Sequence, residues 1–304
     1  MTDVPVSSRP PAVTGGAREA DMPMNRRDFF QNAYGTAGAA LITALGGPEW
    51  LRGATARKAS DVLYLGPDRI KVTRLAIGLG TNAGNVQREL GLQGVADYLK
   101  FAFDQGHFFW DTADAYKTHP HVRQALKSIP REKVTILTKT DVHTAAEMKT
   151  DLDRYRRELG TDYIDIVLLH GMHTPKWPDE FQGVMDVLSE AREKGIILTH
   201  GASIHSLEAL RMAAKTPWCR VQLQGINPAG VRMDSTDPAI VVAALRQSKA
   251  AGKGVMGMKV LGEGALRDRL DETLRFVLGL DCVDCFTIGA ANRDELADLI
   301  RRIG

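Results

Sequence analysis

Four polar residues stand at, or just beyond, the ends of successive apolar runs in the sequence. Asp111 closes "HFFWD", Lys139 closes "VTILTK", His170 follows "DIVLL", and Tyr116 lies five positions after Asp111. An ammonium next to a phenol favours the phenolate and is expected to lower its pKa, while an acid holds the lysine charged. A neutral imidazole polarises an oxygen by donating a hydrogen bond to it. Together these groups are suited to protonating a carbonyl oxygen.

Such a site contains no nucleophile, so the electron pair is expected to arrive from a cofactor as hydride. Each residue also has a structural interpretation. Asp111 and Lys139 could form an ion pair, Tyr116 could be a packing residue, and His170 could be a core histidine. The chemical interpretation is favoured because all four residues follow successive predicted strands.

Eight short apolar runs between residues 73 and 290 predict the elements that position these residues. Their continuous hydrophobicity is typical of parallel strands buried on both faces. Amphipathic stretches lie between them, and one begins with a capping box of Thr144 and Glu147 and ends at Gly160. The pattern predicts a single-domain (β/α)8 TIM barrel over residues 57–304. An open doubly wound sheet is the competitor, but "AIGLGTNAGN" matches its glycine-rich turn only weakly.

The composition excludes some classes of protein. Thirty-nine basic and thirty-seven acidic residues give a net charge of +2, so no nucleic-acid partner is expected. Three cysteines are too few for a disulfide framework. Cys282 and Cys285 form a C-x-x-C pair but lead into a predicted strand rather than a helix, so a structural role is favoured over a redox role.

Residues 1–56 are predicted to be a disordered or helical export segment. Arg26 and Arg27 precede two phenylalanines, a weakly apolar stretch over residues 33–47, and small residues at 54 and 56. The stretch is shorter than a membrane span, so no stable membrane insertion is expected. The layout resembles a bacterial twin-arginine (Tat) signal, which implies the Tat machinery as a partner and a periplasmic or otherwise exported location. The alternative is an amphipathic helix with an incidental arginine pair.

From about Tyr64 to the C-terminus the chain resembles the aldo-keto reductase family. "WDTADAY" is similar to the family's Phe-Asp-Thr-Ala-x-x-Tyr, "ILTKT" to its strand-end lysine, and "LGTDYIDIVLLHG" to its Leu-Gly-x-Asp-Tyr-Ile-Asp-Leu-x-x-x-His. The resemblance implies reduction of an aldehyde or ketone by NAD(P)H. It makes Tyr116 the general acid, Asp111 and Lys139 the residues that adjust the pKa of Tyr116, and His170 the residue that orients the substrate.

The cofactor is expected at the loops after the last two strands, where barrels of this type bind phosphate. The resemblance adds a serine and a glutamine for the nicotinamide amide and implies NADP, with NAD as the alternative. An ordinary capped surface helix is the competing interpretation of the last loop. The predicted cofactor-binding residues are Ser203, Gln222, Lys259, Gly262, Gly289, Ala290, Asn292 and Arg293. Gln224 points the same way on the strand as Gln222, so the sequence does not decide which of the two holds the nicotinamide amide.

Several positions depart from the family pattern. Ile204 replaces the usual asparagine after the serine, and Met258 stands where many members stack a tyrosine on the nicotinamide. Glu295 and Leu299 occupy offsets where the arginine and asparagine of a 2′-phosphate site are usual, and Lys117 replaces a glycine. "THPHV" replaces a Gly-x-Ser-Glu stretch. The acid–base set is intact, whereas the choice between NADP and NAD stays open.

Two other functions are alternatives to carbonyl reduction. A metal-dependent hydrolase would need His119, His121, His170 and His173 to converge, but Pro120 and the loop setting argue against an H-x-H metal pair on a strand, so no metal is expected. The second alternative is a barrel that binds the nicotinamide nucleotide as a sensor or partner module and catalyses no reaction. Met172, His173 and Trp177 follow the fourth strand and are predicted to shape the pocket for a small carbonyl substrate. The sequence predicts neither the particular substrate nor the oligomeric state.

Overall fold

The computed structural model describes residues 57–233 and 235–304, so the predicted export segment lies outside the described residues. The described chain forms a closed barrel of parallel strands in the order β10-β3-β4-β5-β6-β7-β8-β9. This confirms the predicted (β/α)8 fold. The barrel strands are β3 (Leu75–Gly78), β4 (Phe109–Asp111), β5 (Thr135–Thr140), β6 (Ile164–Met172), β7 (Ile197–Ile204), β8 (Val221–Gly225), β9 (Gly254–Met258) and β10 (Cys285–Ile288).

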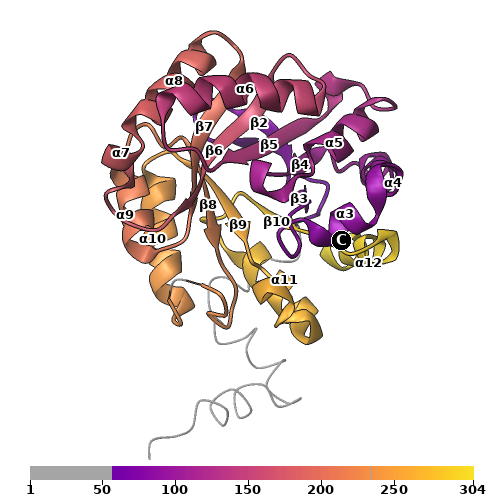
Figure 1. Ribbon diagram of the computed structural model, residues 1–304. Helices are drawn as coiled ribbons and strands as arrows, with labels where there is room; N and C mark the ends of the chain where they lie inside the picture. Colours follow the sequence, from indigo (N-terminus) through magenta and orange to yellow (C-terminus); the bar gives the residue numbers. More distant parts are fainter. Residues whose placement is uncertain (1–56, 234) are drawn as a thin grey trace, which may run out of the picture. The chain divides into compact units, whose positions relative to one another are not determined.

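Helices surround the barrel and return the chain to the start of each next strand (Figure 1). They are α3 (Asn85–Glu89), α4 (Gly91–Asp104), α5 (His119–Leu126), α6 (Ala145–Leu159), α7 (Trp177–Glu180), α8 (Gln182–Glu193), α9 (Leu207–Lys215), α10 (Pro238–Ala250), α11 (Leu270–Gly279) and α12 (Arg293–Ile303). Short 3-10 turns add η3 (Asp114–Tyr116), η4 (Arg131–Lys133), η5 (Gly262–Gly264) and η6 (Arg267–Arg269).

The predicted start and end of α6 are confirmed. The Thr144 hydroxyl accepts a hydrogen bond from the Glu147 N–H at 3.2 Å, and the Glu147 carboxylate accepts from the Thr144 N–H at 3.2 Å. Gly160 ends the helix with a φ of 70°, a left-handed conformation that glycine adopts without steric cost. The cap matters for the site because α6 follows the strand that carries Lys139.

Two apolar layers hold the barrel together. One lies between strands and helices. The other fills the barrel interior and includes Phe109, Leu137, Leu223 and Met256. The hairpin β1 (Val62–Leu65) and β2 (Ile70–Thr73) contributes to the interior layer, so it closes the end of the barrel where the strands begin. A packed interior leaves the opposite, carboxyl-terminal end as the place for a site.

The closing hairpin is fixed by one partly buried carboxylate, that of Asp68. Arg192 and Arg220 donate to it at 2.5 and 2.6 Å, and the Thr199 hydroxyl donates at 2.6 Å. Burial raises the pKa of Asp68, but the hydrogen bonds from Arg220, Arg192 and Thr199 outweigh it and bring the pKa to about 2. Asp68 therefore stays ionised and ties the hairpin to β7 and to the segments that precede β7 and β8.

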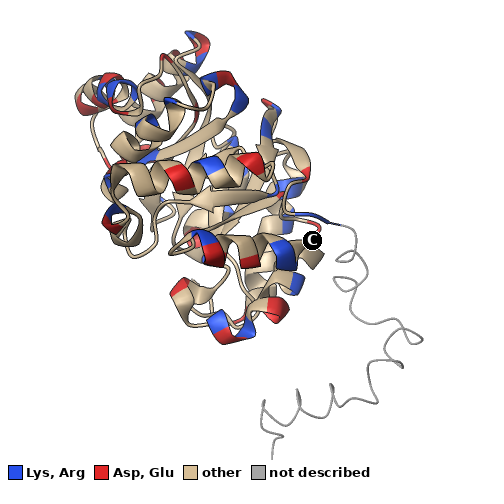
Figure 2. Ribbon diagram, turned by 90° about the vertical axis from the view of Figure 1, so that its right-hand side faces the viewer, with Lys and Arg blue, Asp and Glu red and all other residues tan. Residues whose placement is uncertain are grey.

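Acidic and basic side chains are interspersed along the outer helices, with no broad region of one sign in this view (Figure 2). None of the helices in the described part of the chain is long and apolar enough to cross a membrane.

Candidate active site

The four predicted catalytic residues come from three adjacent strands at the carboxyl-terminal end of the barrel. Asp111 ends β4, and Tyr116 lies on η3 just beyond it. Lys139 is the penultimate residue of β5 and His170 lies two residues before the end of β6. Because β4, β5 and β6 pair in parallel, their carboxyl ends meet on one rim.

The Asp111–Lys139 ion pair is the buried centre of this group. The Lys139 Nζ atom lies 2.5 Å from Asp111 Oδ1 and donates to the Thr112 carbonyl at 2.9 Å. Lys139 is 1% exposed and Asp111 4% exposed. Burial alone would lower the pKa of Lys139, but the attraction of Asp111 and Tyr116 outweighs it and raises that pKa. Lys139 is therefore a permanent ammonium whose direction is set by Asp111.

The Tyr116 phenol lies beside this ammonium. The Lys139 Nζ atom is 3.5 Å from the Tyr116 hydroxyl and 4.7 Å from the centre of its ring. The expectation that Lys139 lowers the pKa of Tyr116 is only partly right. Burial raises that pKa by more than Lys139 lowers it, so the pKa lies above its ordinary value of 10. The phenol is protonated at neutral pH, as a proton donor must be.

Gly80, which follows β3, packs flat against the Tyr116 ring. A Cβ atom at position 80 would lie 2.5 Å from Tyr116 Cε2 and 2.6 Å from Cζ. These distances are far shorter than a van der Waals contact, so only glycine leaves room for the ring. Sequence reasoning missed this residue, although "LGT" directly follows the first barrel strand.

We expect Gly80→Ala to reduce carbonyl reduction by about 100-fold, because the added methyl group pushes the phenol away from Lys139 and a displacement of about 1 Å costs that much. Steady-state kinetics at saturating nucleotide measure the effect. Gly183→Ala in α8 is the matched control, since a Cβ there would meet only Ala145 at an ordinary 3.5 Å. Equal activity of the two variants would show that the Tyr116 ring is not held by Gly80.

His170 also lies beside the phenol. The two rings lie edge to face with centres 5.7 Å apart. The His170 Nδ1 atom pairs with Asp141 at 3.0 Å, a partner that sequence reasoning missed. If Nδ1 carries the hydrogen in that bond, a neutral ring has no hydrogen on Nε2. A donor role of His170 Nε2 toward a substrate oxygen therefore stays a prediction.

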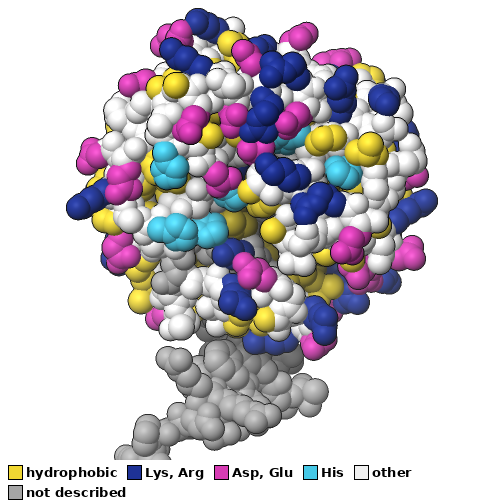
Figure 3. Space-filling view, in the orientation of Figure 1, with side chains coloured by type: hydrophobic (Ala, Val, Ile, Leu, Met, Phe, Trp, Pro, Cys, Tyr) yellow, Lys and Arg dark blue, Asp and Glu magenta, His cyan; other side chains and the backbone are white. Residues whose placement is uncertain are grey.

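The rim around His170 carries further imidazole rings. His173 and His205, at the ends of β6 and β7, lie edge to face with ring centres 5.3 Å apart. Burial, Lys259 and the neighbouring histidines lower the pKa of His205 to about 4, so its ring is neutral at neutral pH. On the face drawn in Figure 3, histidine side chains gather near a hollow in the middle. His173 is exposed, whereas Trp177 is 1% exposed and packs in the core instead of lining a pocket.

Ser203 is the best placed of the predicted residues for a nicotinamide amide. It pairs in register with Leu223, whose side chain belongs to the barrel interior, so Ser203 faces the interior as well. Its hydroxyl is buried and has no hydrogen-bond partner. Buried polar groups are normally satisfied, so an unpaired one at a rim fits a ligand amide.

Gln222 lies on the other face of its strand. It pairs with Ala202, which belongs to the layer between strands and helices. Its side chain is 0% exposed, and neither amide atom has a hydrogen-bond partner. The structure therefore does not bring Gln222 and Ser203 to the same face, and a shared role for the two remains a prediction.

The loop after β9 carries the predicted cationic residue. Lys259 lies there with its ammonium 3.3 Å from Glu263, and Gly262 is buried with a φ of 55° in η5. Gly289 and Ala290 follow β10, and a Cβ at Gly289 would lie 2.1 Å from the Thr81 hydroxyl oxygen. Close approach of the backbone therefore requires glycine at position 289.

The start of α12 is occupied by the protein's own carboxylate and amide side chains. Asn292 accepts from the Glu295 N–H and Glu295 accepts from the Ala291 N–H, both at 2.9 Å. These contacts use donors that a phosphate was predicted to take, and the Glu295 charge opposes an anion. Arg293 is exposed, with its guanidinium carbon 4.4 Å from the centre of the Phe101 ring. Ser203 and Lys259 thus fit a nicotinamide nucleotide better than the α12 terminus does.

A hollow of about 640 Å³ lies at the other end of the barrel, among residues such as Lys71, Glu132 and Asp165. It is open to solvent and is lined by residues of the closing hairpin and the strand starts. None of the four predicted catalytic residues lines it. The chemistry of the side chains, rather than the volume of a hollow, locates the active site.

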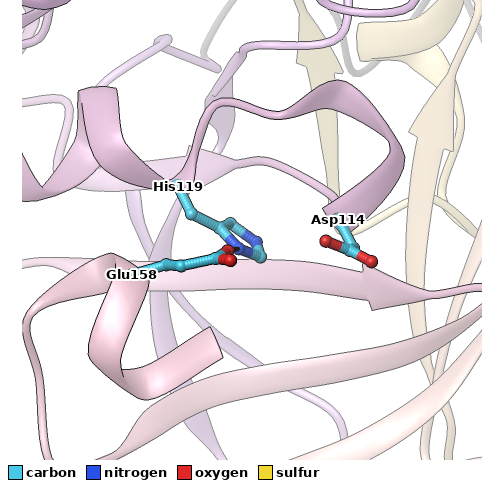
Figure 4. A group of neighbouring side chains, drawn as sticks. All are labelled: Asp114, His119 and Glu158. Atoms are coloured by element: carbon cyan, nitrogen blue, oxygen red, sulfur yellow. Dashed lines mark hydrogen bonds and ion pairs between the residues drawn. The ribbon is translucent and has the colours of Figure 1, made fainter. Parts of the chain in front are cut away.

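The four histidines of the metal hypothesis do not converge. His119 contacts Glu158 and Thr138, whereas His170 contacts Tyr116 and Asp141. Within the described ranges, the one group with metal-ligand geometry is Asp114, His119 and Glu158 (Figure 4). Cys282 and Cys285 are free and buried, and burial raises the pKa of Cys282 to about 11. This agrees with a structural role for these thiols.

Comparisons with known proteins agree with this geometry. The family model described as the aldo/keto reductase family matches residues 76–299. The chain therefore belongs to the aldo/keto reductase family. An aldo-keto reductase from Bacillus halodurans in its holo form superposes with a TM-score of 0.67 at 18% identity, over 81% of this chain and 91% of that chain. At that identity the superposition shows the fold alone.

Two curated relatives are similar over shorter stretches. The NAD/NADP-dependent indole-3-acetaldehyde reductase of Schizosaccharomyces pombe is 32% identical over 36% of this chain and 38% of its own length. Methylglyoxal reductase of Escherichia coli O157:H7 is 32% identical over 42% of this chain and 50% of its own length. The chain thus spans about half, or less, of the curated relatives it matches.

Proposed function

We propose that the protein reduces an aldehyde or ketone to an alcohol with NAD(P)H, with Tyr116 as the general acid. The observation that carries this proposal is the buried ammonium of Lys139 within 3.5 Å of a protonated phenol at the open end of a barrel. The names of the relatives agree, since one is an NAD/NADP-dependent indole-3-acetaldehyde reductase and another a methylglyoxal reductase.

The residues of this chain carry out the proton transfer of the reaction. Tyr116 gives its proton to the carbonyl oxygen, and the ammonium of Lys139 stabilises the phenolate that remains. Asp111 holds that ammonium in place at 2.5 Å. His170, beside the phenol, orients the substrate oxygen. A bound nicotinamide nucleotide supplies the hydride, and we assign its amide to Ser203 and its phosphates to Lys259.

The activity is tested by incubating the purified protein with NADPH or NADH and a panel of aldehydes, ketones, quinones and sugars. The expected result is oxidation of the nucleotide with formation of the matching alcohol. A protein that binds the nucleotide but oxidises it with no member of the panel would instead be a sensor or partner module. Comparing the two nucleotides also decides between NADP and NAD.

We further propose that a twin-arginine signal within residues 1–56 exports the protein through the Tat machinery to the periplasm. The support is the order of Arg26-Arg27, two phenylalanines, a short apolar stretch and small residues. We infer that the nucleotide is bound before export, because this route carries folded proteins.

Export is expected to be lost when Arg26 and Arg27 are both replaced by lysine. Immunoblots of periplasmic and cytoplasmic fractions from a bacterial host measure it. The double variant should remain almost entirely in the cytoplasm, whereas Arg9→Lys with Arg18→Lys, outside the motif, should leave export unchanged. Equal periplasmic amounts of the arginine-pair variant and the unaltered protein would contradict the proposal.

A further inference from the structure

Helix α6 is linked to the strand of Lys139 on both sides of that residue, directly at Thr140 and through His119 at Thr138. Lys139 shares the interior face of β5 with Leu137, so Thr138 and Thr140 face outward, toward the helices. The Thr140 hydroxyl accepts from the Tyr155 hydroxyl of α6 at 3.1 Å. The Thr138 hydroxyl pairs at 2.7 Å with His119 Nε2, whose Nδ1 pairs at 2.9 Å with Glu158 of α6.

The same helix also holds the turn that carries Tyr116. Arg154 of α6 donates two hydrogen bonds of 2.8 Å to the two carboxylate oxygens of Asp114. Asp114 begins η3 and lies two residues before Tyr116. Bidentate arginine–carboxylate pairs fix orientation as well as distance. One helix therefore sets the position of both the phenol and the ammonium.

These contacts form a network of Asp114, His119, Arg154 and Glu158, and further contacts make Arg154 its centre. Its guanidinium also donates to Asp151 at 2.8 and 3.0 Å and to Glu158 at 3.1 Å. Figure 4 shows Glu158 and His119 facing each other, with Asp114 close by. The network includes His119, in the stretch where the sequence departs from the family pattern.

The geometry favours a positioning network over a metal site. Asp114, His119 and Glu158 could offer three ligand atoms. However, both oxygens of Asp114 and one of Glu158 already accept from Arg154, and the other Glu158 oxygen pairs with His119. A cation would have to displace a guanidinium that already balances these charges.

We propose that Arg154 and Asp114 are positioning residues that keep the Tyr116 phenol within reach of the Lys139 ammonium. The inference rests on the proposed reductase function. Neither residue is assigned contact with substrate or nucleotide. Their loss loosens the η3 turn and lengthens the contact between phenol and ammonium, so proton transfer slows while substrate and nucleotide binding persist.

The test compares the full-length variants Arg154→Met and Asp114→Asn with Arg156→Met. Arg156 lies on the same helix and makes exposed contacts with Asp153 and the Asp162 carbonyl, which makes it a matched control. Both network variants should lower kcat by about 10- to 100-fold, with KM and NADPH affinity within about twofold of the unaltered protein. The control should keep the full kcat.

A pH profile of alcohol oxidation separates positioning from general support of the fold. This direction requires the phenolate, and Lys139 lowers the pKa of Tyr116. Loosening the contact should therefore move the rise in oxidation rate to higher pH in both network variants. Arg154→Lys, which keeps the charge but not the forked geometry, should show a smaller shift. It also serves as the folded variant if Arg154→Met is unstable.

Three results would overturn the inference. The first is a kcat for Arg154→Met and Asp114→Asn equal to that of Arg156→Met. The second is a loss of kcat with an unchanged pH profile and an equal loss of nucleotide affinity. The third is a tightly bound metal ion in the unaltered protein that Asp114→Asn releases. If the unaltered protein reduces no carbonyl compound, the reductase proposal fails instead, and the two failures are distinguishable.

Discussion

Replacing Tyr116 by phenylalanine is expected to lower carbonyl reduction by about 100- to 10,000-fold, the usual contribution of a general acid. The change removes one hydroxyl, which lies 3.5 Å from the Lys139 ammonium, and leaves the ring against Gly80. Nucleotide binding should survive because the proton donor is not among the residues assigned to it. Fluorescence titration with NADPH and NADH measures binding, and steady-state kinetics measure turnover.

The pKa of Tyr116 also predicts how the unaltered protein responds to pH. Reduction requires the protonated phenol, and burial holds its pKa above the ordinary value of 10. Titration of this group should therefore not slow reduction until the pH exceeds that value. Tyr64→Phe is the control, since Tyr64 is 57% exposed on the closing hairpin. A Tyr116→Phe variant with activity close to that of Tyr64→Phe would remove Tyr116 from the mechanism.

Replacing Lys139 by methionine should cost both activity and stability. Loss of the ammonium leaves the phenolate without its stabilising charge, so reduction should fall by at least about 100-fold. It also leaves Asp111, 4% exposed, without its partner. Breaking a buried pair from one side typically costs about 3–5 kcal/mol. Urea unfolding measures the free energy, and the same samples are assayed for reduction.

A double variant separates these two losses. Adding Asp111→Asn to Lys139→Met removes the unpaired charge, so most of the stability should return while activity stays absent. Lys100→Met is the control, because its ion pair with Asp104 is solvent-exposed and should contribute less than about 1 kcal/mol. Recovery of activity in the double variant would show that the buried pair serves the fold and not the reaction.

The fold was predictable from the sequence because its signals are local. Continuous apolar runs predict strands buried on both faces, and the capping box of Thr144 and Glu147 marks the start of α6. The positions of Asp111, Lys139 and His170 follow from the strands, since parallel strands in a barrel bring their carboxyl ends together.

The contacts that tune the site join residues distant in sequence and have no local signal. Arg154 and Asp114 are 40 residues apart, and His170 and Asp141 are 29 apart. The effect of Lys139 on the pKa of Tyr116 was predicted from the neighbouring charge, but the larger opposing effect of burial was missed because the extent of burial is not visible in the sequence. Burial depends on how the barrel and helices pack around the ring.

The phosphate site was similarly difficult to predict. A helix start with Asn292 and Arg293 is typical of an anion site, yet the Glu295 side chain accepts from the Ala291 N–H and the Asn292 side chain accepts from the Glu295 N–H. Ser203 faces the barrel interior, because strand alternation fixes its direction once the register is known, and its role at the nicotinamide amide stays a prediction. Gln222 faces the helices for the same reason.

The most direct test of the central claim follows the hydride itself. The protein is mixed, in a single turnover, with NADPH deuterated at the transferable ring carbon and a carbonyl compound that it reduces. We expect an alcohol that carries the deuterium on its carbinol carbon, from the unaltered protein but not, at the same time point, from Tyr116→Phe. Bound nucleotide that stays unoxidised with every carbonyl compound, or an alcohol without deuterium, would contradict this expectation.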